Sequence, residues 1–79
     1  ETAISFSLKE DVSDLSLRIF NLRGQLVRTM LNSEAKEKGE HQIVWDGTDN
    51  QGRTVNSGLY FYRMNTGDFQ SIRRMMLLK

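Results

Sequence analysis

Residues 44–62 read VWDGTDNQGRTVNSGLYFY, and this stretch carries the strongest structural signal in the chain. A lone tryptophan is followed by Asp-Gly, then by a polar segment ending in Asn-Gln-Gly, and later by Ser-Gly and three closely spaced aromatic residues. Asp and Asn side chains accept hydrogen bonds from nearby backbone N–H groups, and glycine adopts positive φ without strain, so this composition is typical of tight turns. The stretch therefore predicts two strands joined by an ordered loop, whose turn residues are Asp46, Gly47, Asp49, Gly52 and Gly58.

The same loop could instead hold a metal ion, because Asp46 and Asp49 offer carboxylate oxygens. A calcium loop of the EF-hand kind requires Gly at its sixth position and Glu at its twelfth. Counted from Asp46, these positions hold Gln51 and Ser57, so that pattern fails. A looser site formed by the two carboxylates, Asn50 and a backbone carbonyl remains as the weaker alternative. We expect turn chemistry here, with no metal and no other cofactor.

Apolar and polar residues alternate along most of the chain, which is the pattern of strands with one buried face. This alternation predicts strands at residues 4–8, 15–19, 26–31, 41–45, 60–64 and 69–78. No segment shows a helical apolar stripe over three turns. The pattern therefore favours an all-β fold, an immunoglobulin-like (fibronectin III-like) antiparallel β-sandwich of six to seven short strands. No disulfide is expected, because the sequence contains no cysteine.

The inner faces of these strands define the predicted structural core, which consists of Ile4, Phe6, Leu17, Ile19, Ile43, Trp45, Tyr60 and Tyr62. His41 is in phase with two of these residues, so we expect it at the edge of the core. The polar segment NSEAKEKGE, residues 32–40, has no apolar stripe and is expected to be a solvated loop.

The length of 79 residues indicates one domain, residues 1–79, and the net charge of +1 gives no reason to expect a nucleic-acid partner. No apolar run approaches the ~18–20 residues that span a bilayer, so no membrane insertion is expected. Charge is uneven, however, because residues 53–79 carry five basic side chains against one acidic side chain. These basic residues either keep the edge of a small sheet in solvent or form a tail that a partner recognises.

Catalysis is not expected. The only histidine is His41, so no second histidine is available to activate a Ser or Thr nucleophile. Asp46 and Asp49 could form a glycosidase pair only beside a substrate cleft, which a sandwich of this size hardly provides. Three aromatic residues lie out of phase with their strands and either pack under loops or form a surface for sugar or single-stranded nucleic acid: Phe20, Phe61 and Phe69.

The stretch WDGTDNQGRTVNSGLYFYRM, residues 45–64, resembles the signature of the immunoglobulin-like domain of the flagellar hook-capping (FlgD-like) protein family. That signature combines Trp-Asp-Gly, an Asp/Asn-Gly turn and Ser-Gly-x-Tyr-x-Tyr. The chain is also similar to the C-terminal modules of this superfamily that, in their type A form, serve as sorting domains for type IX secretion. The blocks that carry this similarity are TAISFSL, SLRIFNLRGQLVRTML, GEHQIVWDG, SGLYFYR and RRMMLLK.

The resemblance implies a non-catalytic C-terminal module of a larger exported bacterial protein, secreted or at the cell surface, that acts as a sorting or anchoring signal. Its partners would be proteins of the secretion or surface-assembly machinery, and the isolated module would be a monomer. The residues expected to be recognised are Arg73, Arg74, Met75, Met76, Leu77, Leu78 and Lys79. Two alternatives are a hook-cap-like structural assembly module and a small carbohydrate-binding accessory domain.

Overall fold

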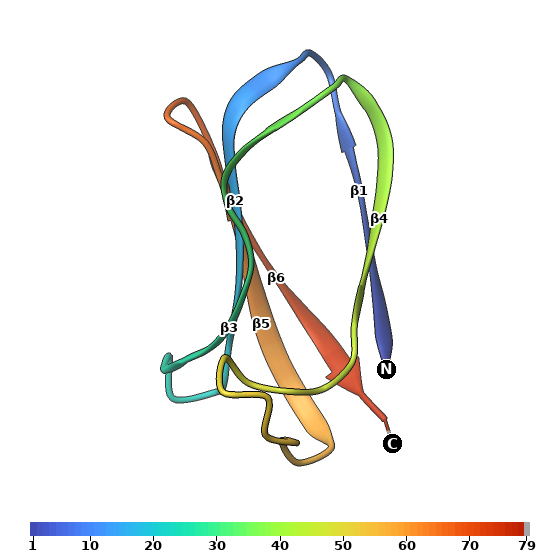
Figure 1. Cartoon of the computed structure of the whole chain (residues 1–79), viewed down its shortest axis with the longest axis vertical. Coiled ribbons are helices and arrows are strands. Elements are labelled where there is room, and N and C mark those ends of the chain that lie inside the picture. Colours follow the sequence, from blue (N-terminus) through green and yellow to red (C-terminus); the bar gives the residue numbers. More distant parts are fainter. Residues whose placement is uncertain (79) are drawn as a thin grey trace.

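Two antiparallel β-sheets face each other in the computed structural model, which describes residues 1–78 (Figure 1). The strands, in chain order, are β1 (Thr2–Leu8), β2 (Val12–Phe20), β3 (Leu26–Lys36), β4 (Gly39–Trp45), β5 (Gly58–Asn65) and β6 (Gln70–Leu77). β1 pairs with β4, and the other four strands form a sheet in the order β3-β2-β5-β6. The predicted antiparallel sandwich without a disulfide is therefore confirmed.

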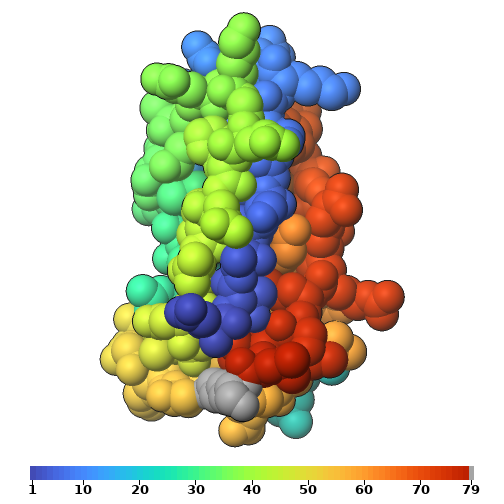
Figure 2. All heavy atoms as spheres, turned by 90° about the vertical axis from the view of Figure 1, so that its right-hand side faces the viewer, coloured from blue at the N-terminus to red at the C-terminus, as the bar shows by residue number. Residues whose placement is uncertain are grey.

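The chain forms two hairpins, β2–β3 and β5–β6, and crosses between the sheets after β1, β3 and β4. Figure 2 shows the two-stranded sheet from outside, with β3 along one side of it and β6 along the other. The start of β1 and the end of β6 lie at the same end of the sandwich (Figure 1), where the Thr2 hydroxyl donates a hydrogen bond to the Met76 carbonyl at 2.9 Å. None of the residues 1–78 belongs to a helix that is long and apolar enough to cross a membrane.

The core lies between the sheets and takes buried apolar side chains from all six strands: Ile4, Leu8, Leu15, Leu17, Ile19, Leu31, Trp45, Tyr60, Met64 and Leu77. Three residues expected in the core, Phe6, Ile43 and Tyr62, lie at its rim, where they pack against it but stay partly exposed. The two-stranded sheet is narrower than its partner and leaves the flank between β1 and β6 open. Phe6 and Tyr62 line a groove along that flank.

The segment 32–40 is not the solvated loop that we expected. β3 continues through it to Lys36, and β4 begins at Gly39. The polar half of β3 pairs with the start of β2, with Glu34 opposite Leu15. Residues 32–35 are exposed, so this half of the strand is held by backbone pairing and shows no apolar alternation in the sequence. The prediction was wrong because this half of β3 lies at the edge of the sheet, where backbone pairing with β2 forms a strand without a buried side chain at residues 32–35.

The last strand also differs slightly from the predicted range of residues 69–78, because β6 begins at Gln70 and ends at Leu77. Phe69 closes the preceding hairpin turn, because its backbone N–H donates to the Thr66 hydroxyl at 3.2 Å and its carbonyl accepts from the Thr66 N–H at 2.9 Å. Leu78 follows the end of the strand, and Lys79 lies outside the described residues.

Candidate functional site

The loop between β4 and β5 is held in shape by the side chains of two aspartates. Asp46 Oδ1 accepts hydrogen bonds from the Thr48 N–H at 3.1 Å and from the Thr48 hydroxyl at 2.6 Å. Asp49 Oδ1 accepts from the N–H groups of Gln51 and Arg53, both at 3.0 Å, and Asp49 Oδ2 lies 3.3 Å from Arg53 Nε. Positive φ angles complete the turns at Gly47 (81°), Gly52 (80°) and Gly58 (146°).

These hydrogen bonds lower the pKa of both carboxyl groups below the usual value of 3.8. The main cause is the Thr48 hydroxyl at Asp46 and the Arg53 backbone N–H at Asp49. A donor that bonds the carboxylate favours its charged form. The two carboxylates thus stabilise the loop from within. Among residues 1–78, no three His, Asp or Glu side chains gather closely enough to hold a metal ion.

The loop covers the outer edge of β3 near the start of that strand. The Asn50 N–H donates to the Val27 carbonyl at 3.0 Å, and the Asn50 side-chain oxygen accepts from the Thr29 N–H at 2.9 Å. Asn50 therefore bonds to β3 as a residue of a neighbouring strand would, with its side-chain amide replacing a backbone carbonyl. At Val27 and Thr29 the edge of β3 is therefore closed to pairing with a strand of another chain.

Arg28, on β3, fastens the loop from the side of the sheet. Its Nη1 donates to the Thr48 hydroxyl at 2.8 Å and to the Asp49 carbonyl at 3.0 Å. We did not single out this residue from the sequence, because no local pattern links an arginine on one strand to a turn about twenty residues later. Only the packing of the loop against β3 shows its role.

Two core side chains anchor the ends of the loop. Trp45 Nε1 donates to the Thr48 carbonyl at 2.9 Å, and the Tyr60 hydroxyl donates to the Asn56 carbonyl at 2.6 Å. Burial raises the pKa of Tyr60, so this hydroxyl stays protonated and remains a donor at physiological pH. The loop is therefore an ordered part of the sandwich, held by hydrogen bonds to its own carboxylates and to core side chains.

The C-terminal segment does not present its side chains on one surface. Arg74 lies opposite Phe61 on the outer face of the four-stranded sheet, whereas Arg73 lies on the other face and lines the groove between β1 and β6. Met75 packs against the core, and Leu77 is fully buried. The exposed side chains beyond the arginines are those of Met76 and Leu78, and Lys79 lies outside the described part.

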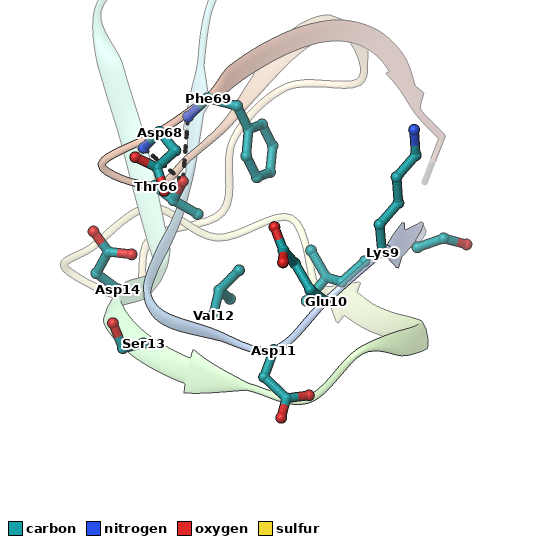
Figure 3. A pocket seen from close by; sticks show the side chains of 11 residues that line it. Lys9, Glu10, Asp11, Val12, Ser13, Asp14, Thr66, Asp68 and Phe69 are labelled. Atoms are coloured by element: carbon teal, nitrogen blue, oxygen red, sulfur yellow. Dashed lines mark hydrogen bonds between the residues drawn. The ribbon is translucent and has the colours of Figure 1, made fainter.

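A second hollow lies between the β1–β2 connection and the β5–β6 hairpin, where the Phe69 ring extends into the space between them (Figure 3). Two of its acidic groups serve the fold. Asp14 Oδ2 accepts from the Gly67 N–H and Asp11 Oδ1 from the Lys38 N–H, both at 2.8 Å. These bonds tie neighbouring turns together and explain the acidic side chains structurally.

The aromatic residues outside the core do not form one sugar-binding surface. Phe20 and Phe61 are cross-strand partners on the outer face of the four-stranded sheet, whereas Phe69 lies at the hollow near β1. His41, at the rim of the core, stacks on Phe6 with ring centroids 5.3 Å apart, and its Nε2 lies 2.7 Å from the Glu37 carbonyl oxygen.

Two facing antiparallel sheets, a buried tryptophan and a loop that closes one sheet edge define an immunoglobulin-like β-sandwich module. Within this class, the chain belongs to the FlgD Ig-like domain family, which it matches over residues 1–68. The part of the predicted resemblance that concerned this family is confirmed.

Among solved structures, the chain is similar to FlgD from P. aeruginosa, with a TM-score of 0.69 and 19% sequence identity. The match covers 95% of this chain and 58% of that chain, so this chain spans little more than half the length of that FlgD. At this identity the likeness shows the fold alone. A comparison with curated proteins gives no match.

Proposed function

We propose that this chain is a non-catalytic assembly module of an exported protein, which packs against neighbouring protein subunits in a structure of the flagellar hook-cap kind. The observation that carries this proposal is membership of the FlgD Ig-like domain family over residues 1–68. The sorting function that we expected first is more specific than membership of this family, and the family match does not support it.

The use of the signature loop favours an assembly role. Asp46 and Asp49 bond inside the loop, and Asn50 covers the edge of β3. The polar side chains of this loop therefore stabilise the fold. The exposed faces of the two sheets remain as the surfaces available to a partner. A module of this kind contributes by contact with other proteins.

Cross-linking in living cells tests this proposal. A photoreactive residue would replace Val44, on the outer face of the small sheet, or Ile72, on the outer face of the large sheet, in the complete parent protein. Both side chains are exposed. We expect irradiation to join at least one position to a neighbouring subunit of an extracellular assembly. Cross-links only to membrane-bound secretion proteins, or none above the unirradiated control, would contradict the proposal.

Sorting remains a second candidate because of one specific feature. β6 is an edge strand of the four-stranded sheet and carries the adjacent arginines Arg73 and Arg74, both exposed. An exposed strand edge with basic side chains is a surface that a receptor could read by strand addition. Its test is separate from that of assembly and is given below.

A further inference from the structure

The four-stranded sheet has an outer face that is turned away from β1 and β4, toward the left in Figure 1. No strand formed by residues 1–78 covers it. Cross-strand pairing places neighbouring side chains on this face: Phe20 beside Phe61, Phe61 beside Arg74, and Arg63 beside Ile72. We call these five residues, together with Met76, the outer arginine face.

Two apolar side chains of the outer arginine face are exposed. Ile72 is 59% exposed and Met76 is 49% exposed. Both lie on β6, at alternate positions on either side of Arg74. Single exposed apolar residues are normal, but apolar side chains gathered on one face and rimmed by charge are typical of an interaction surface.

The arginines of this face lack acidic partners. The Arg63 guanidinium lies over the Phe20 ring, 5.0 Å from its centroid, and its buried Nε makes no hydrogen bond. β5 and β6 contain no Asp or Glu. The ion pair found among residues 1–78 lies away from this face, between Arg53 and Asp49 in the loop after β4. A carboxylate from outside would offer these guanidinium groups the charge-assisted hydrogen bonds that they lack within the chain.

The chemistry of the face selects among partners. A second copy docked symmetrically would place arginine against arginine, which like-charge repulsion opposes. Single-stranded nucleic acid needs free rings for base stacking, but Arg63 covers Phe20 and the half-buried Phe61 offers little surface. We propose that the outer arginine face binds a partner protein that presents carboxylate side chains among apolar ones. This inference rests on the proposed assembly function and specifies its contact surface.

β6 supplies a matched pair of variants. Arg73 and Arg74 are neighbours with the same charge, but they lie on opposite faces of the strand. Arg74→Gln removes a charge from the outer arginine face, and Arg73→Gln makes the same charge change outside it. Any effect of net charge alone would appear equally in both variants.

The test uses the isotope-labelled chain and a short synthetic peptide in which glutamate alternates with leucine. NMR chemical shifts are followed as the peptide is added. We expect saturable shifts at Arg63, Ile72 and Arg74 that weaken as salt is raised, because exposed charge pairs are screened. Arg74→Gln should weaken binding about threefold, and Arg73→Gln should leave it unchanged. Peptides with glutamine for glutamate, or serine for leucine, should bind more weakly.

Several results would overturn the proposal. These are no saturable shift at millimolar peptide, shifts centred outside the face, equal binding of the glutamine peptide, or equal effects of Arg73→Gln and Arg74→Gln. Tighter binding of oligothymidylate would show a nucleic-acid surface, and shifts that depend on protein concentration without peptide would show a second copy. If the peptide fails but the parent protein still cross-links into an assembly, the assembly function stands and only this contact surface is discarded.

Discussion

The rings of Trp45 and Tyr60 meet edge to face, with centroids 5.1 Å apart and planes at 79°. Each side chain also donates a hydrogen bond to a carbonyl of the loop between them. The pair therefore joins the core to the loop, with its apolar rings buried and its polar atoms at the loop. Such aromatic pairs contribute about 0.5–1.5 kcal/mol beyond the area that they bury.

Trp45→Ala should lower the free energy of unfolding by about 3–5 kcal/mol, because it leaves a large cavity between the sheets. In a domain of this size, that loss approaches the total stability. Trp45→Phe keeps a ring but loses the Nε1 hydrogen bond, so it should cost less. Thermal unfolding should therefore give the highest melting temperature for the natural chain, a lower one for Trp45→Phe and the lowest for Trp45→Ala. A shift of only a few degrees for the alanine variant would mean that the tryptophan does not anchor the core.

Asn50→Ala should expose the edge of β3 while leaving the core intact. The loss of the bond from the Thr29 N–H should cost about 1 kcal/mol. Hydrogen exchange should become faster at the Thr29 amide and stay unchanged at Leu17, in the centre of the sheet. Unchanged exchange at Thr29 would contradict the edge-covering role of Asn50.

Stability should fall at acidic pH because of the loop carboxylates. Both have a pKa below 3.8 in the folded chain, so the stability that they contribute is present above that pH and is lost as the pH falls through the folded values. Asp49→Asn should melt at a lower temperature than the natural chain at neutral pH, because it loses the ion pair with Arg53. The two melting temperatures should converge as the pH falls below the folded pKa. A constant difference would argue against this linkage.

The sequence was sufficient for the fold class because most strands here have one buried and one exposed side. Leu15, Leu17 and Ile19 alternate with Ser16 and Arg18, and all three apolar side chains are fully buried. The polar half of β3 escaped this reasoning because it lies at the edge of the sheet and its side chains at residues 32–35 are all exposed. Backbone pairing, which leaves no mark on side-chain pattern, holds that half in the sheet.

The surfaces were harder to anticipate. We expected residues 73–79 to be recognised together by a partner, yet strand alternation places Arg73 and Arg74 on opposite faces and turns Leu77 into the core. Successive side chains of a strand point to opposite faces, so this rule also predicts that two adjacent arginines lie on different sides of the sheet. The role of Arg28 and the open outer face depend on contacts between distant segments, which a single sequence does not reveal.

Secretion of a reporter fused ahead of the chain separates assembly from sorting. Replacing Arg73 and Arg74 together by Gln should change stability by less than about 1 kcal/mol, because both side chains are exposed. The assembly account predicts that the reporter reaches the medium at the unmodified level. A strong fall in secretion, with the variant still folded by thermal unfolding, would instead support recognition of β6 by secretion machinery.

The central claim is that the module serves assembly outside the cell, and deletion of residues 1–79 from the parent protein in its own organism tests it most directly. The measurement is the distribution of the parent protein among cells, free secreted protein and the extracellular assembly. The account predicts that the truncated protein is exported at the normal level but is missing from the assembly. Retention of the truncated protein inside the cell, or its normal incorporation into the assembly, would contradict it.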